Sequence, residues 1–188
     1  MDQQEDMWLK VRTKGNAIPH GKARVYFTCH PQDFDKYFES ICEQIFKTQD
    51  CAVYYTEDMT MTYTEDQLET DLGQMTLFVI PVTFKLLQGG NRAVEIDLAF
   101  ANENHIPILP LMIEPGLVDL FTQKFGKIQY LNPNSKDETA IRYEEKLKTF
   151  LEDVLIGSEL RRRVQDAFDA YIFLIGEKKC ILQCVMTI

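Results

Sequence analysis

Short apolar runs alternate with amphipathic stretches along the first 155 positions of the chain. Runs rich in Val, Ile, Tyr and Phe that are bounded by turn residues are typical of buried strands. Five runs have this character: ARVYFTC at 23–29, CAVYY at 51–55, MTLFVIPV at 75–82, IPILPLM at 106–112 and KIQYL at 127–131. We therefore predict five strands. The nearly continuous run at 75–82 indicates a strand that is buried on both faces.

The stretches between these runs carry apolar residues at three- and four-residue steps, as amphipathic helices do. This spacing predicts helices over 34–46, 92–102, 115–121 and from 137 or 139 to about 155. Thr62 and Glu65 have capping-box spacing for a further short helix that ends at Leu72. The core stripe predicted for the last helix consists of Ile141, Leu147, Phe150, Leu151 and Val154.

A chain in which strands and helices alternate forms right-handed crossovers and a parallel sheet covered by helices on both faces. We expect an α/β, flavodoxin-like three-layer domain over residues 23–155, with a five-stranded parallel sheet in the order 2-1-3-4-5. Residues 1–22 are mixed and polar and contain several helix-breaking residues. We expect them to form a flexible N-terminal arm, with its single tryptophan, Trp8, packed on the domain.

The end of the chain does not fit this domain. Residues 156–167 are polar and Arg-rich and predict a linker helix. The following apolar run, FDAYIFLI at 168–175, is similar to the first strand of the domain. Because residues 168–188 are too few for a second domain of ordinary size, we expect the truncated start of one, with an orphan C-terminal strand.

The charge balance narrows the classes of partner. With 20 Lys and Arg against 29 Asp and Glu, the formal net charge is −9. An acidic chain is a poor match for nucleic acid or for anionic membrane. No apolar run reaches 18 residues and the acidic start does not resemble a signal peptide, so we expect a cytoplasmic protein. The five cysteines include no CxxC pair and are typical of free thiols in a reducing compartment.

The acidity is concentrated in one segment. From Thr48 to Phe84 the chain has no Lys or Arg and seven acids: Asp50, Glu57, Asp58, Glu65, Asp66, Glu69 and Asp71. Such a segment is either a solvated face or a surface for a basic partner.

Four segments, in their order and spacing, resemble a bacterial TIR (Toll/interleukin-1 receptor homology) domain: ARVYFTCHPQDF, CAVYYTEDM, MTLFVIPV and AVEIDLAFANENHIPILPLM. In that family a helix with a Glu-Ile pair leads into an Ile/Val-Pro-Ile strand, matched here by Glu95-Ile96 and Ile106-Pro107-Ile108. FDAYIFLI also resembles a TIR first strand, which implies two TIR-like domains in tandem. Two places depart from the family: Thr28-Cys29 stands where Ser-Tyr is usual, and Asn91 where NAD-cleaving members often have Trp.

This resemblance implies a catalytic residue. Glu95 matches the glutamate that contacts the nicotinamide-side ribose in NAD-cleaving TIR enzymes. A carboxylate there stabilises oxocarbenium-like charge, as in glycosidases. Glu95 is therefore the predicted catalytic residue, and the alternative is an ordinary acid on the surface of a helix. NAD is the expected substrate, and neither a cofactor nor a metal is expected.

Four further residues are expected to bind the substrate. His30 and Asp33 follow the first strand, at the edge where open α/β sheets bind ligands. His30 meets a phosphate or adenine or is a plain loop residue, and Asp33 either caps the next helix or contacts ribose. Tyr55 precedes the loop through which TIR domains gate their site and associate. Arg92 either reaches a diphosphate or pairs with Glu95 along the helix.

Two functions follow from the resemblance. One is an NAD glycohydrolase or cyclase in bacterial immune signalling. The other is a non-catalytic module that associates with other TIR domains, including its own copies, through the acidic segment. A third and simpler alternative is an isolated flavodoxin-like regulatory domain. The chain has no P-loop, dinucleotide fingerprint or GxSxG elbow, which argues against those enzyme classes.

Overall fold

A computed structural model describes residues 8–14, 23–48, 50–57, 63–133, 135, 139, 141–154 and 157. The chain divides into two compact units, Met1–Leu155 and Ile156–Ile188, and every described residue except Gly157 belongs to the first. The linker helix expected at 156–167 and the truncated domain expected at 168–188 therefore lie outside the described residues, apart from Gly157.

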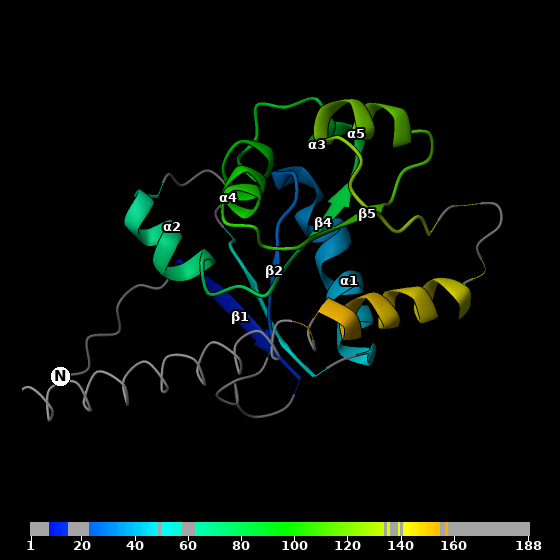
Figure 1. Ribbon diagram of the computed structural model, residues 1–188, viewed down its shortest axis with the longest axis horizontal. Helices are drawn as coiled ribbons and strands as arrows, with labels where there is room; N and C mark the ends of the chain where they lie inside the picture. The colour runs from blue at the N-terminus through cyan, green and yellow to red at the C-terminus, as the bar shows by residue number, and fades with distance from the viewer. Residues whose placement is uncertain are drawn as a thin grey trace, which may run out of the picture. The chain divides into compact units, whose positions relative to one another are not determined.

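Strands and helices alternate along the first unit, as Figure 1 shows. The strands are β1 (Lys10–Thr13), β2 (Arg24–Phe27), β3 (Ala52–Tyr55), β4 (Leu77–Val82) and β5 (Ile108–Met112). The helices are α1 (Phe34–Thr48), α2 (Glu65–Leu72), α3 (Phe84–Leu87), α4 (Leu98–Glu103), α5 (Val118–Phe125) and a last helix over 141–154, yellow in Figure 1. A 3-10 turn, η1 (Pro31–Asp33), precedes α1, and a π-helical turn, η2 (Ala93–Asp97), precedes α4.

The described strands form one sheet in the order β1-β3-β2-β4-β5. β3, β2, β4 and β5 are parallel, and they follow the order predicted for the first four strands. β1 is the exception, because it pairs antiparallel with β3, Lys10 opposite Tyr55 and Thr13 opposite Ala52. The prediction of a wholly parallel sheet was therefore wrong, and so was a flexible arm at residues 10–13.

The predicted fifth strand at 127–131 is reduced to one bridge between Leu111 and Leu131. The Leu131 N–H donates to Pro110 at 3.0 Å, and its carbonyl accepts from Met112 at 2.8 Å. A longer ladder would next need a backbone N–H at position 110 on β5 and at position 133 after Leu131, and both positions are proline. Because proline has no N–H, the ladder ends after a single bridge.

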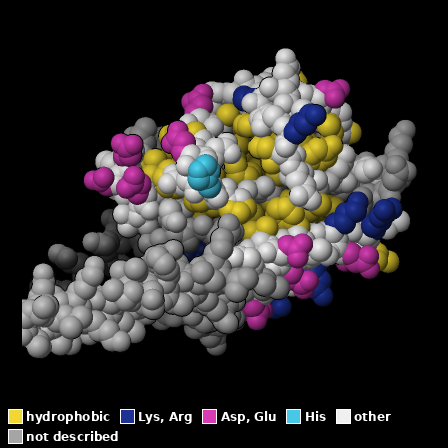
Figure 2. Space-filling view, in the orientation of Figure 1, with side chains coloured by type: hydrophobic (Ala, Val, Ile, Leu, Met, Phe, Trp, Pro, Cys, Tyr) yellow, Lys and Arg dark blue, Asp and Glu magenta, His cyan; other side chains and the backbone are white. Residues whose placement is uncertain are grey.

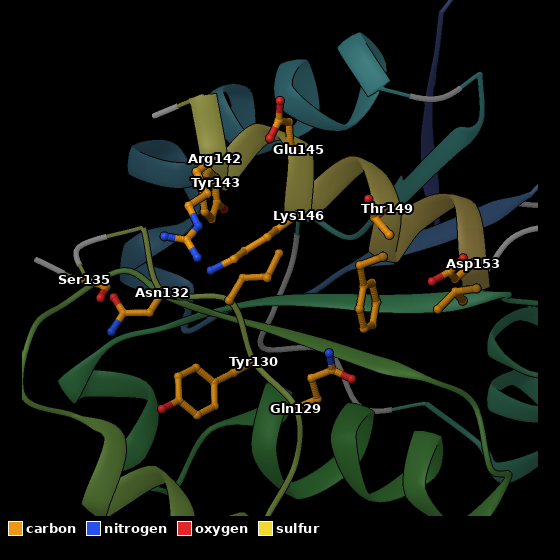
Figure 3. Close-up of a pocket in the computed structure, with 13 residues that line it drawn as sticks. Gln129, Tyr130, Asn132, Ser135, Arg142, Tyr143, Glu145, Lys146, Thr149 and Asp153 are labelled. Carbon is orange, nitrogen blue, oxygen red and sulfur yellow. The ribbon is translucent and has the colours of Figure 1, made fainter. Parts of the chain in front are cut away.

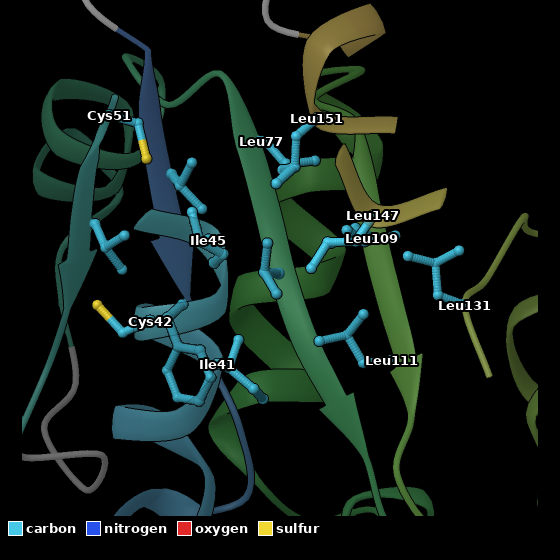
Figure 4. Packing of buried hydrophobic residues seen from close by; sticks show 14 of the residues in the cluster. Ile41, Cys42, Ile45, Cys51, Leu77, Leu109, Leu111, Leu131, Leu147 and Leu151 are labelled. Atoms are coloured by element: carbon cyan, nitrogen blue, oxygen red, sulfur yellow. The ribbon is translucent and has the colours of Figure 1, made fainter. Parts of the chain in front are cut away.

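Side chains alternate across the sheet and form a core on each face. Val25 and Phe27 of β2 point toward α1 and the helix at 141–154, and part of this cluster appears in Figure 4. Tyr26, between them in sequence, lies in the opposite core with residues of α2 and α4. The turns and helices around α3 and α5 extend that second core beneath β4 and β5. The result is the three-layer arrangement expected from the sequence.

Two helices differ locally from their predictions. α2 is opened by a capping box between Thr64 and Gln67, whereas the predicted cap, Thr62, lies outside the described residues. The helix at 141–154 buries Tyr143, Leu147 and Leu151, four residues apart, against the α1 side of the sheet. Ile141, which the predicted stripe included, is 71% exposed.

Candidate functional site

The order in which the parallel strands are added to the sheet reverses at β2, and this topological switch point defines a candidate site. From β2 the chain adds β3 on one side, and then β4 on the other. Ligands of open α/β sheets bind outside the carboxyl ends of the strands at such a switch point. Here those ends lead into residues 28–33 after β2 and residues 83–85 after β4.

Asp33 links the two loops that meet at the switch point. Its carboxylate accepts a hydrogen bond from the Thr83 hydroxyl at 2.7 Å and lies 3.8 Å from the Lys85 ammonium. Asp33 is buried in the turn η1, whereas Lys85 is exposed. The Thr83 oxygen also accepts from the Leu86 N–H and caps α3. The prediction that Asp33 caps the first helix was therefore wrong, because its carboxylate binds residues after β4.

His30 performs the local capping instead. Its Nδ1 accepts a hydrogen bond from the Gln32 N–H at 3.2 Å and so caps the turn η1. Nδ1 accepts only when it carries no proton, which leaves the second ring nitrogen, Nε2, as the donor. The ring is partly exposed at the carboxyl end of β2. His30 therefore keeps one N–H donor outside the η1 cap.

A second buried carboxylate, Asp97, lies behind the carboxyl end of β2. It accepts from the Thr28 hydroxyl at 2.5 Å and from the Tyr26 hydroxyl at 3.3 Å. The Arg92 Nε donates to its other oxygen at 3.2 Å. Burial raises the pKa of Asp97, and Arg92 and Thr28 oppose that rise. The pair of Asp97 and Arg92 thus forms a buried ionic centre between β2 and the turn η2.

The predicted contact between Arg92 and Glu95 is absent, since Arg92 pairs with Asp97 and is itself buried. Glu95 lies on the same turn, η2, and is exposed. Among the described residues it has no ion-pair partner within 4 Å. Because Asp97 ties η2 to Thr28, the turn that carries Glu95 is anchored to the carboxyl end of β2.

Tyr55 ends β3 and is partly buried. Its ring packs on Phe38 and Phe34, with centroid separations of 4.3 and 5.6 Å. Burial and the nearby Glu57 raise the pKa of its hydroxyl. Tyr55 lies on the α1 side of the sheet, so the structure joins it to the hydrophobic core and gives it no contact with His30 or Glu95 among the described residues.

Two of the described thiols, Cys29 and Cys42, lie where burial keeps them protonated. Cys29, Cys42 and Cys51 are buried and form no disulfide. Burial, reinforced by Asp33 and Asp97, raises the pKa of Cys29, and burial raises that of Cys42 to about 11. A thiol held protonated is a poor nucleophile. Within the described residues no group of three or more His, Cys, Asp and Glu side chains is placed to hold a metal ion.

A separate groove of about 950 Å³ lies between the segment 129–135 and the helix at 141–154. Arg142 and Lys146, one helical turn apart, extend from that helix over the groove, with Asn132 and Ser135 on the facing segment (Figure 3). Two acids, Glu145 and Asp153, share its lining. None of the residues predicted to form the site lines this groove, so it carries no part of the switch-point chemistry.

Acidic side chains gather on α2, as Figure 2 shows. Glu65, Asp66 and Glu69 are exposed there. Asp71 differs from them, since its carboxylate accepts a hydrogen bond from the Trp8 indole at 2.6 Å. Of the seven acids, three thus lie exposed on α2, and a fourth on the same helix is bound to Trp8.

Sequence reasoning did not identify Asp97, Thr83 or Lys85. The available signal was the position of Asp97, an acid between Ile96 and Leu98 and four residues after the buried Ala93. An acid in an apolar helical stripe requires a buried partner. Thr83 and Lys85 carried no comparable signal, because their importance depends on the approach of α1 to the end of β4.

The fold and the site define an α/β protein with a mostly parallel five-stranded sheet and polar residues at its switch point. No family model matches the chain, and no curated protein sequence matches it. Among the described residues, no helix is long and apolar enough to cross a membrane.

Proposed function

We propose that the chain is a TIR-like signalling domain that binds NAD at the carboxyl edge of its sheet and cleaves the bond between nicotinamide and ribose. The resemblance of four segments to bacterial TIR domains motivates this function. The strand order β3-β2-β4-β5 is compatible with it, and the switch point supplies an edge for a nucleotide.

The observation that carries the proposal is the position of Glu95. It is exposed on the turn η2, and Asp97 of the same turn is bonded to Thr28 at the end of β2. Glu95 therefore supplies a carboxylate on a turn that Asp97 fixes to the carboxyl end of β2, the strand that His30 follows.

This arrangement suits cleavage of a positively charged leaving group. As the bond to nicotinamide lengthens, positive charge builds on the ribose, and nearby Glu95 stabilises it. Nicotinamide leaves with the bonding electrons and becomes neutral, and a water oxygen bonds to the anomeric carbon of ribose and releases a proton to solvent. In the proposal His30 Nε2 donates to a phosphate oxygen of the substrate, and the exposed Lys85 ammonium adds positive charge for the diphosphate.

Release of nicotinamide by the full chain, measured by chromatography over a range of protein concentrations, tests this function. We expect Glu95→Gln to lower the rate about 100-fold, because it removes the charge and keeps the shape. Glu103→Gln is the matched control, since Glu103 is an exposed glutamate at the end of α4. It is expected to keep the wild-type rate.

Two results contradict the proposal. One is the absence of nicotinamide release at every protein concentration. The other is equal release by the wild type and by Glu95→Gln.

The exposed acids of α2 favour a second candidate, a TIR-type module that binds other TIR domains or its own copies through this face. Glu65, Asp66 and Glu69 present three negative charges on one short helix. A cluster of like charge matches a partner surface of opposite charge and accelerates encounter. This candidate needs no activity at Glu95.

Charge reversal tests the second candidate. We expect Lys at positions 65, 66 and 69 to reduce self-association in analytical ultracentrifugation at low salt. The control carries the same three changes at Glu43, Glu103 and Glu144, which are exposed on other helices. Unchanged association in the α2 variant, or an equal loss in the control, contradicts the proposed use of this face.

A further inference from the structure

Trp8 lies in a slot made by Tyr63, Arg92 and Asp71. The indole ring stacks on the Tyr63 ring with centroids 4.0 Å apart and an interplanar angle of 28°. The guanidinium carbon of Arg92 is 4.2 Å from the Tyr63 centroid and 4.9 Å from the Trp8 centroid. The indole N–H donates to an Asp71 oxygen at 2.6 Å.

The indole does not satisfy the polar atoms of this slot. Nη1 and Nη2 of Arg92 and the Tyr63 hydroxyl are buried and make no hydrogen bond within 3.5 Å, although the hydroxyl lies close enough to the guanidinium to help raise the pKa of Arg92. Only Nε of Arg92 is bonded, to Asp97. Buried donors without acceptors are rare in folded proteins and unfavourable. Indole has one donor and no acceptor, so Trp8 offers the guanidinium only the edge and face of its rings.

We propose that this slot is a binding site for a purine base and that Trp8 occupies it in the absence of ligand. A purine is a planar bicycle of indole size and stacks on a tyrosine ring in the same way. Its amino or ring N–H replaces the indole N–H as donor to Asp71. Its ring nitrogens or carbonyl oxygen accept from Arg92, a pairing that arginine makes with purine edges in DNA. A purine therefore offers the Arg92 guanidinium the acceptors that indole lacks.

Trp8 is placed so that it can leave. It is partly exposed and precedes β1, a four-residue strand on the edge of the sheet. Val11 of that strand is 38% exposed, and β3 is the only strand with which β1 pairs among the described residues. Short edge strands are among the least stable parts of a fold. Trp8 thus competes with the ligand, and its departure opens the slot.

This site is independent of NAD cleavage. Its residues come from the N-terminal segment, α2, Tyr63 and Arg92, and none of them is Glu95, His30 or Lys85. A purine has the two fused rings of indole, whereas a pyrimidine has one, so we expect purine nucleotides to be preferred.

The experiment compares adenosine and guanosine monophosphates with cytidine monophosphate and ribose 5-phosphate. Trp8 is the single tryptophan of the chain, so its fluorescence reports the slot directly. We expect purine nucleotides to shift Trp8 emission to the red as the indole enters water. By calorimetry, Trp8→Ala is expected to bind purine nucleotides at least about tenfold more tightly than the wild type, because the competitor is gone.

The platform is tested in the Trp8→Ala background. Tyr63→Leu is expected to weaken purine binding about tenfold or more, because base stacking is lost. Tyr37→Leu, at a partly buried tyrosine on α1, is the matched control and is expected to have no effect. If the Tyr63→Leu variant does not fold by circular dichroism, Asp71→Asn replaces it and is expected to weaken binding.

Three outcomes overturn the proposal. They are purine binding by Trp8→Ala no tighter than by the wild type, equal binding of ribose 5-phosphate and adenosine monophosphate, and unchanged binding after Tyr63→Leu or, where that variant does not fold, after Asp71→Asn. Glu95→Gln is expected to keep the purine affinity. A failure of NAD cleavage and a failure of the purine site are therefore separate results.

Discussion

The Thr83 hydroxyl donates a 2.7 Å hydrogen bond to Asp33 and so joins the residue that ends η1 to the residue that follows β4. The two residues are 50 positions apart in sequence. Their contact joins the loop after β2 to the loop after β4 on the α1 side of the sheet. On the α4 side, Asp97 joins the turn η2 to Thr28 after β2. Two buried carboxylates thus hold the loops that form the carboxyl edge.

Loss of the first carboxylate should destabilise the protein. Asp33→Ala leaves the buried Thr83 hydroxyl without its acceptor, and we expect the free energy of unfolding to fall by about 1–3 kcal/mol. Urea unfolding followed by circular dichroism measures this change. Asp35→Ala is the control at an exposed acid in the first turn of α1 and should change little. Equal effects of the two substitutions would show that the Asp33 contact contributes nothing.

Loss of the second carboxylate should be more severe. Asp97 is fully buried, and Asp97→Ala leaves the Arg92 guanidinium as an uncompensated buried charge. We expect the free energy of unfolding, measured by urea unfolding, to fall by about 3–5 kcal/mol. Asp119→Ala, at an exposed acid of α5, is the control. If the Asp97→Ala and Asp119→Ala variants have the same free energy of unfolding, the result contradicts a stabilising ion pair between Asp97 and Arg92.

The last helix offers a matched pair of apolar substitutions. Leu147 is 2% exposed in the α1-side core, and Ile141, on the same helix, is 71% exposed. Leu147→Ala should lower the free energy of unfolding by about 2–5 kcal/mol, through lost burial and a cavity. Ile141→Ala should be almost neutral. If the two variants have equal stability, the helix docks through a different face.

Alkaline pH should destabilise the protein partly through Cys42. Burial raises the pKa of this thiol in the fold from 9.0 to about 11. The folded state then holds the proton more tightly than the unfolded state, so this contribution is complete below pH 9 and is lost as pH rises toward 11. Urea midpoints at pH 8 and pH 10.5 should differ more in the wild type than in Cys42→Ala. Equal differences contradict the raised pKa.

Hydrophobic pattern predicted the main framework correctly. The alternation of apolar runs and amphipathic stretches predicted β2 to β5, α1 and the last helix. Burial explains this success, because strands inside the sheet are apolar throughout and a helix with one buried face has apolar residues at three- and four-residue steps. β1 was missed because its residues, KVRT, are polar and depend on pairing with β3 rather than on burial. The fifth strand was overestimated, because its pairing depends on donors that Pro110 and Pro133 lack.

The candidate site was less predictable than the fold. His30 and Asp33 follow β2 as predicted, but their partners depend on tertiary contacts. Arg92 was expected either to contact a diphosphate or to pair with Glu95, three residues on, and it pairs instead with the buried Asp97. Spacing along a helix shows which side chains are neighbours, and it does not show which of them the core will cover.

The central claim, that the carboxyl edge of the sheet binds NAD, is tested most directly by NMR. The measurement is a titration of ¹⁵N-labelled Glu95→Gln protein with NAD, in which turnover is suppressed. The account predicts that the largest amide shifts fall at His30, Phe84 and Lys85 and around position 95. Shifts confined to the opposite end of α1, at Lys47 and Thr48, or no shifts at millimolar NAD, would contradict it.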